Sequence, residues 1–118
     1  MRRQFTNCRT RQPKTGPNKT ESEYMDFLEQ RRLIGEIISY GYEMVKFRLA
    51  GNWKTTYKPD FYVLRTDGQL EVHEVKGFME DDAAVKLKVA ANRFPFLIFK
   101  LVRKKTKKEG GGWNIEII

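Results

Sequence analysis

Charged residues at two places in the chain have the side chains that metal-dependent cleavage of a phosphodiester requires. Asp60 follows Pro59, and after thirteen further residues comes the run Glu74-Val75-Lys76. Such cleavage needs an activated water, neutralisation of the charge at phosphorus and help for the leaving oxygen, and a hard cation can supply all three. Magnesium prefers carboxylate and water ligands. We therefore predict Asp60 and Glu74 as metal ligands, and Lys76 as the group that holds or helps to deprotonate the attacking water.

This chemistry requires two strands that end at the same place. A strand from Leu70 to Lys76 puts Glu74 and Lys76 on one face, because side chains alternate along a strand. His73 then lies on the other face, where we expect a packed neighbour rather than a catalytic base. A preceding strand over residues 57–64 carries Asp60. Taken alone, the same charges would also fit a surface hairpin whose side chains face water.

The surrounding pattern predicts how these strands are embedded. Thr20, with Glu23 three residues later, is typical of a helix start, and apolar residues at helical spacing extend the predicted helix to about Tyr40-Gly41. The later elements are expected to be strands over 42–49, 57–64 and 70–76, a helix from about Asp82 to Arg93, and strands over 96–102 and 113–118. Ala50-Gly51-Asn52 and residues 66–69 supply turns. The resulting order, α-β-β-β-α-β-β, predicts an α/β fold with a central mixed sheet flanked by helices.

Length and composition restrict the class of protein. A chain of 118 residues fits one domain, which we place at residues 20–118, after a flexible basic arm over residues 1–19. Cys8 and His73 are the only residues of their types, which excludes an internal disulfide and a zinc site of Cys and His from one chain. No apolar run approaches the ~20 residues of a membrane span, so we expect a soluble, cytoplasmic protein without membrane contact.

The net charge of +8 is concentrated at two places. Residues 1–19 carry six basic side chains and no acid, residues 103–108 carry five more, and residues 20–102 are nearly neutral. Such clusters are typical of proteins that bind a polyanion, although a solubilising tail or loop would have the same composition. The predicted DNA contacts in them are Arg2, Arg3, Arg9, Arg11, Lys14, Lys19, Lys104, Lys105, Lys107 and Lys108.

Pro59-Asp60 and Glu74-Val75-Lys76 resemble the signature of the PD-(D/E)xK nuclease superfamily, which includes restriction enzymes and several phage and archaeal junction-resolving enzymes. The resemblance covers roughly residues 20–102 and implies a restriction-endonuclease-like core. A narrower resemblance is to a family of small phage proteins usually described as of unknown function. The runs that carry it are Asn18-Lys19-Thr20-Glu21, Gly35-Glu36-Ile37, Tyr57-Lys58-Pro59-Asp60-Phe61, His73-Glu74-Val75-Lys76-Gly77 and Val85-Lys86-Leu87-Lys88.

The superfamily resemblance also implies a fuller site. It implies Mg²⁺ or Mn²⁺ as cofactor, with the backbone carbonyl of Val75 as a further ligand. A third acid on the first helix would complete the site, for which Glu21 is our choice and Glu23 the rival. Lys86, on the helix after the metal strand, would lie near the DNA.

Three functions from different classes follow. The resemblance implies a metal-dependent endodeoxyribonuclease that acts as a homodimer on double-stranded or branched DNA such as a Holliday junction, in the host-cell cytoplasm if the protein is phage-encoded. A second reading is a DNA-binding module that has the fold without the activity. A third is a basic adaptor that binds RNA and whose acids are structural. The sequence names neither the bases that are read nor the surface that would pair two subunits.

Overall fold

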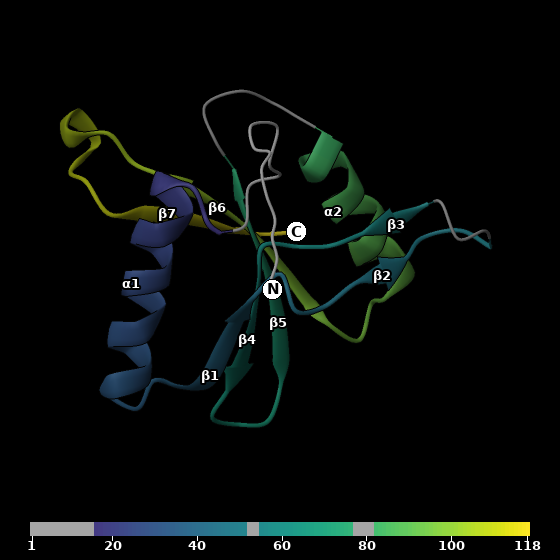
Figure 1. The fold of residues 1–118 in the computed structure, drawn as a ribbon, viewed down its shortest axis with the longest axis horizontal. Coiled ribbons are helices and arrows are strands. Elements are labelled where there is room, and N and C mark those ends of the chain that lie inside the picture. Colours follow the sequence, from purple (N-terminus) through teal and green to yellow (C-terminus); the bar gives the residue numbers. More distant parts are fainter. Residues whose placement is uncertain (1–15, 52–54, 77–81) are drawn as a thin grey trace, which may run out of the picture.

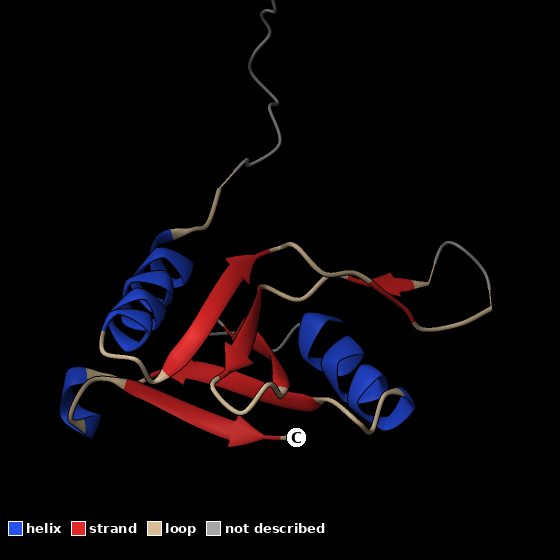
Figure 2. Ribbon diagram, turned by 90° about the horizontal axis from the view of Figure 1, so that it is seen from below, coloured by secondary structure: helices blue, strands red, loops and turns tan. Residues whose placement is uncertain are grey.

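Two helices lie on opposite sides of a five-stranded sheet in the computed structural model, which describes residues 16–51, 55–76 and 82–118 (Figures 1 and 2). The elements are α1 (Lys19–Leu33), β1 (Ile37–Tyr42), β2 (Phe47–Arg48), β3 (Thr56–Tyr57), β4 (Phe61–Arg65), β5 (Leu70–Lys76), α2 (Asp82–Arg93), β6 (Ile98–Lys104), the 3-10 turn η1 (Lys107–Glu109) and β7 (Trp113–Ile117). This confirms a mixed α/β class with a central mixed sheet flanked by helices.

The main sheet has the strand order β1-β4-β5-β6-β7. β4 is antiparallel to both β1 and β5, β6 is parallel to β5, and β7 is antiparallel to β6. Parallel neighbours require a crossover, and α2 lies within the segment that connects β5 to β6. β5 is therefore the centre of the sheet, and its residues 71–75 are all buried.

The N-cap of α1 is Asn18, two residues before the predicted N-cap Thr20. The side-chain oxygen of Asn18 accepts the Glu21 N–H at 2.8 Å, and Glu21 Oε1 accepts the Asn18 N–H at 3.1 Å. This reciprocal capping box satisfies two backbone donors that no helical carbonyl can reach. Thr20 lies inside the first turn, so its predicted role as N-cap is wrong.

The predicted end of the first helix, near Tyr40-Gly41, is also wrong. α1 ends at Leu33, and Gly35 follows in the left-handed region with φ at +84°. A residue without a side chain adopts this conformation without steric cost, which allows the chain to leave the helix. The apolar residues that seemed to continue the helical spacing belong instead to β1, which begins at Ile37.

The strands before β5 also differ from expectation. The expected strand over 42–49 is replaced by β1, which pairs with β4, and by the short β2, which pairs with β3 in a separate two-stranded sheet. The expected strand over 57–64 is divided into β3 and β4 by residues 58–60. Pro59 lies in this break, because proline has no N–H to donate to a strand ladder.

The later elements follow the sequence pattern more closely. β5 has the predicted bounds, α2 ends at the predicted Arg93, and β7 covers most of the predicted closing strand. β6 begins two residues later than expected, at Ile98. No helix in the described ranges is long and apolar enough to cross a membrane.

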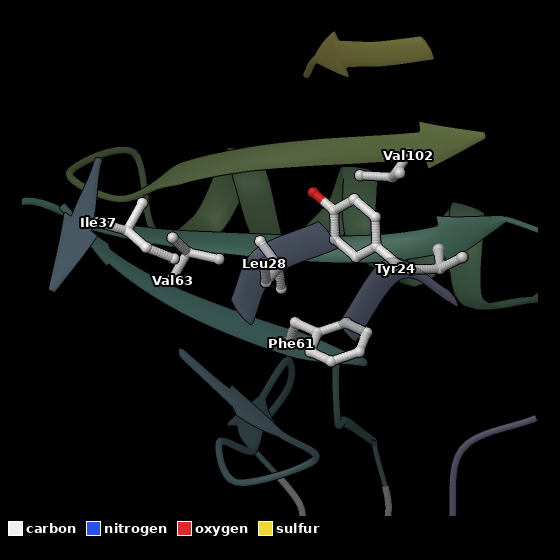
Figure 3. Close-up of a cluster of buried hydrophobic side chains, with 7 residues drawn as sticks. Tyr24, Leu28, Ile37, Phe61, Val63 and Val102 are labelled. Atoms are coloured by element: carbon white, nitrogen blue, oxygen red, sulfur yellow. The ribbon is translucent and has the colours of Figure 1, made fainter. Parts of the chain in front are cut away.

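An apolar cluster on each side of the sheet holds the layers together. On the α1 side, Tyr24 and Leu28 are one helical turn apart and pack on side chains from the sheet (Figure 3): Ile37, Phe61, Val63, Val75 and Val102. On the α2 side, Leu87 and Ala90 pack with Leu49, Tyr57, Val72, Phe99 and Leu101. The two helices therefore pack on β5 and β6 from opposite faces.

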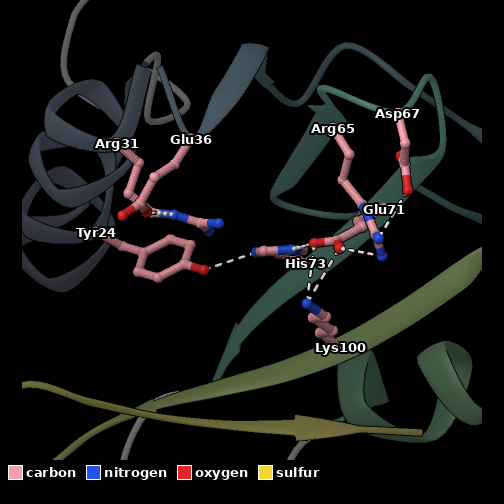
Figure 4. A network of polar contacts seen from close by, with 8 residues as sticks. All are labelled: Tyr24, Arg31, Glu36, Arg65, Asp67, Glu71, His73 and Lys100. Carbon is pink, nitrogen blue, oxygen red and sulfur yellow. Dashed lines mark hydrogen bonds and ion pairs between the residues drawn. The ribbon is translucent and has the colours of Figure 1, made fainter. Parts of the chain in front are cut away.

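A buried chain of hydrogen bonds lies within the α1 layer (Figure 4). Tyr24 Oη is 2.6 Å from His73 Nδ1, and His73 Nε2 is 2.8 Å from Glu71 Oε1. Lys100 Nζ and an Arg65 nitrogen lie 3.1 Å and 3.4 Å from the same carboxylate. His73 is fully buried, which confirms its prediction as a packed neighbour.

The ionisation of this chain assigns each donor. Burial raises the pKa of Glu71, but hydrogen bonds from His73 and Lys100 outweigh burial and bring the pKa to about 2. Burial lowers the pKa of His73, which is therefore neutral at pH 7. Because an ionised carboxylate only accepts, the imidazole proton belongs on Nε2, and Nδ1 accepts from the Tyr24 hydroxyl.

Tyr24→Phe should lower the free energy of unfolding by about 1–3 kcal/mol, because it leaves a buried imidazole nitrogen without its donor. Urea denaturation measures the loss. Tyr40→Phe is the matched control, since its hydroxyl donates to Glu29 near the surface, and its loss should be smaller. Equal losses in the two variants would show that the buried chain contributes little to stability.

Candidate active site

The antiparallel register of β4 and β5 brings Asp60 and Glu74 together. Phe61 pairs with His73 across the two strands, so the residue before Phe61 lies beside the residue after His73. Asp60 Oδ2 also accepts the Val75 N–H at 2.9 Å. The carboxylates are nearly enclosed, with 8% of Asp60 and 7% of Glu74 exposed. The structure thus places two predicted site residues side by side at one end of a strand pair.

Closely spaced acids in a dry environment oppose ionisation. Burial raises the pKa of Asp60 most, and the charge of Glu74 raises it further. The hydrogen bond from Val75 acts in the opposite direction but does not compensate. The folded protein therefore resists carrying both negative charges, and a cation bound between the two carboxylates would relieve this cost.

Tyr57 is a site residue that the sequence reasoning missed. Its hydroxyl donates to Glu74 Oε1 at 2.5 Å, and its ring is buried. The short β2–β3 sheet therefore fixes one oxygen of the Glu74 carboxylate. A usable signal was present: a buried tyrosine needs a partner for its hydroxyl, and Tyr57 lies three residues before Asp60 in the same run.

Lys76 is the last residue of β5 and is half-buried. Strand alternation puts it on the same face as Glu74, as predicted. It is aligned with Arg103 in the parallel ladder with β6, and it lines a cavity of about 580 Å³. The predicted ammonium group therefore belongs to the same end of the sheet as the acids.

The two candidate acids of α1 have different surroundings. Glu21 accepts the Tyr42 hydroxyl at 2.9 Å, and its charge contributes to the raised pKa of Asp60, so it lies within electrostatic reach of the pair. Glu23 instead binds Lys104 Nζ at 2.5 Å. Among the described residues, no three acidic, His or Cys side chains are grouped closely enough to hold a metal. The ligand role of Glu21 therefore stays a prediction, as does that of the Val75 carbonyl.

The predicted DNA-contacting residues fall into separate regions. Arg2, Arg3, Arg9, Arg11 and Lys14 lie outside the described residues. Lys19 is exposed at the start of α1, and Lys86 is exposed on α2. Lys104 is the last residue of β6, and the segment that leads from β6 to β7 carries the other three: Lys105, Lys107 and Lys108.

The segment between β6 and β7 has a defined fold. β6 continues to Lys104, and a second capping box closes the 3-10 turn η1. In it, the Thr106 N–H donates to Glu109 Oε1 at 2.9 Å, and the Glu109 N–H donates to Thr106 Oγ1 at 3.3 Å. The basic side chains are thus held on a built turn.

The fold and site together define a mixed α/β domain with a buried pair of carboxylates and a lysine at one end of its sheet. The chain belongs to the family described as "Protein of unknown function (DUF1064)", whose profile matches residues 14–110. The resemblance to a family of unknown function is thereby confirmed at that level. Searches of curated proteins and of solved structures gave no significant match.

Asp60→Asn should make the metal-free protein progressively more stable than wild type as the pH rises. The folded-state pKa of Asp60 is raised above its ordinary value of 3.8. Wild type therefore loses stability as the pH rises from 3.8 towards the raised folded-state pKa, by up to about 1.4 kcal/mol per pH unit. Asparagine cannot ionise, and its side-chain oxygen can still accept the Val75 N–H. Urea denaturation in EDTA at pH 4.5, 6.5 and 8.5 measures the difference.

The control for this series is Asp67→Asn, which changes an exposed carboxylate at the β4–β5 turn. Its difference from wild type should change little over the same pH range. If Asp60→Asn also shows a constant difference, the acid pair does not carry the electrostatic cost inferred from its burial.

Proposed function

We propose that the protein is a metal-dependent endodeoxyribonuclease of the PD-(D/E)xK type. The observation that carries the proposal is the buried contact between Asp60 and Glu74, with Lys76 next on the same face of β5. Two adjacent buried carboxylates cost stability, and such costly pairs are concentrated at sites of chemistry or metal binding.

The donor set supports Mg²⁺ or Mn²⁺ as cofactor. Both ions favour oxygen ligands, which the two carboxylates supply, and the Val75 carbonyl and Glu21 would add to them. The burial and repulsion that raise the pKa of Asp60 are the effects that a bound cation reverses. When bound, the ion would polarise the phosphoryl oxygen and lower the pKa of a coordinated water.

The side chains of the site would divide the remaining work. Asp60 is oriented by the Val75 N–H and Glu74 by the Tyr57 hydroxyl, so both carboxylates are fixed before substrate arrives. Lys76 would hold the attacking water and offset the charge that develops on the phosphate. These groups lie on strands of the sheet or directly beside them, which keeps their spacing constant.

DNA is the proposed substrate because the basic residues surround this end of the sheet. The turn between β6 and β7 and the start of α1 both carry lysines that a polyanion would contact. An inactive DNA-binding module would use the same lysines, but it gives no reason to bury Asp60 beside Glu74. An RNA-binding adaptor leaves the acid pair unexplained in the same way.

A preference for branched DNA and a homodimer are finer parts of the same proposal. β7 ends the strand order of the main sheet, and Ile117 on it is 69% exposed. An edge strand with exposed apolar side chains offers a surface on which a second copy can pair. Two paired sites would cut two strands of a junction, so paired incisions in a four-way junction are the expected product.

Incubation with supercoiled, linear, single-stranded and four-way-junction DNA tests the proposal. Cutting should occur with Mg²⁺ or Mn²⁺ and stop in EDTA. Asp60→Asn and Glu74→Gln should abolish it, Lys76→Ala should slow it about 10²- to 10⁴-fold, and Asp67→Asn should leave it unchanged. Failure of the wild-type protein to cut any of these substrates with either metal would overturn the nuclease assignment.

Tyr57→Phe tests whether the phenol positions Glu74. Loss of this supporting hydrogen bond should raise the Mg²⁺ concentration needed for half-maximal cutting about 10- to 100-fold. Tyr40→Phe, which removes a hydroxyl from a different pair, should leave that concentration unchanged. If Tyr57 had only a structural role, Tyr57→Phe would lower the free energy of unfolding without changing the Mg²⁺ concentration needed for half-maximal cutting. Both quantities are therefore measured on the same preparations.

A further inference from the structure

The cavity beside Lys76 is made from three elements that are distant in the sequence. The first turn of α1, the end of β5, and the end of β6 with the connection that follows it contribute the lining residues Thr20, Lys76, Arg103, Lys104, Lys105, Thr106, Lys107, Gly111 and Gly112. Its volume of about 580 Å³ lies within the ~300–1,000 Å³ that is usual for binding sites. Among the described residues, no acidic side chain lines it.

The charge of this lining is positive and only partly compensated. Arg103 is 3.4 Å from Glu109, and Lys104 is 2.5 Å from Glu23. By contrast, no ion pair within the described ranges involves Lys105 or Lys107. Because like charges repel across the cavity, an anion bound there would be stabilised by several cations at once.

The position of the cavity relates it to the acid pair. Lys76 lines the cavity and is two residues from Glu74 on the same face of β5. Thr20 and Thr106 add hydroxyl groups that can donate to phosphate oxygens. Exposed lysines continue the basic surface on either side, Lys19 before Thr20 and Lys108 after Lys107.

We propose that this cavity binds a phosphate of the nucleic-acid strand next to the phosphate that is cut. The proposal rests on the proposed nuclease function, and it assigns the cavity as a subsite for a phosphodiester that does not react. A phosphate held there would place the adjoining phosphodiester over Asp60 and Glu74, with Lys76 between the two subsites. Continuation of lysines beyond the cavity fits a strand that extends past it rather than a single nucleotide.

The test measures binding separately from cutting. Binding of a fluorescent DNA duplex is measured in EDTA over a series of salt concentrations. The proteins compared are wild type, the cavity variant Lys105→Gln/Lys107→Gln and the control variant Lys46→Gln/Lys88→Gln. The two double variants lose the same charge from exposed or half-buried positions. The slope of log K against log salt should fall by about 0.9 per lost phosphate contact in the cavity variant, with little change in the control.

The position of the bound phosphate is found with duplexes that carry one neutral methylphosphonate at successive positions. In wild type, one position should weaken binding more than its neighbours, and that penalty should disappear in the cavity variant. The single variant Lys107→Gln, at an exposed position, repeats the measurement if the double variant unfolds.

The outcomes separate this proposal from the nuclease assignment. Equal effects of the cavity and control substitutions on the salt slope, or the absence of a sensitive position, would overturn the phosphate subsite whether or not the protein cuts DNA. A subsite found by binding in a protein that never cuts with Mg²⁺ or Mn²⁺ would uphold the cavity and overturn the nuclease assignment.

Discussion

The register of β4 on β5 is the constraint on which the rest of the structure depends. Phe61 lies opposite His73, and a slip of one residue would exchange the two faces of a strand and separate Asp60 from Glu74. Both faces oppose such a slip. Phe61 and Val63 are enclosed beneath α1, whereas Val72 is enclosed beneath α2. The packing of the two helices therefore also determines where the acids meet.

β5 carries two buried acids that are stabilised in different ways. Glu71 faces α1 and lies near donors from His73, Lys100 and Arg65. Burial raises its pKa, but the hydrogen bonds from His73 and Lys100 outweigh burial and keep the pKa low. Glu74 lies on the other face, and its neighbour is a second acid, Asp60. Burial and the charge of Glu74 raise the pKa of Asp60. Glu71 thus completes a structural network, whereas the pair of Glu74 and Asp60 retains an electrostatic cost. This contrast, more than burial alone, distinguishes the candidate active site from the core.

Some of this arrangement could be predicted because it depends on short-range pattern. The alternation over 70–76 located β5 and assigned Glu74 and Lys76 to one face. The helix end could not be found in the same way, because Ile37 and Ile38 fit a helical and an extended spacing equally well. The left-handed Gly35 decides between the two, and its conformation depends on where the chain must turn.

The partners of the site were harder to predict than its acids. Tyr57 reaches Glu74 only because the chain breaks at residues 58–60 and forms a second small sheet. The choice between Glu21 and Glu23 likewise depends on contacts from other elements, with Tyr42 for the former and Lys104 for the latter. Such tertiary contacts leave little trace in local spacing.

The ion pair between Glu23 and Lys104 joins residues 81 positions apart in the chain. The acid pair, by contrast, is built within the adjacent strands β4 and β5, where Asp60 reaches Val75 over 15 positions. The two parts of the site therefore differ in folding cooperativity. A local opening that detaches α1 removes one wall of the basic cavity, whereas the hydrogen bond from Val75 to Asp60 lies within the strand pair. Under the proposed function, a polyanion would therefore bind in this cavity only when the molecule is completely folded.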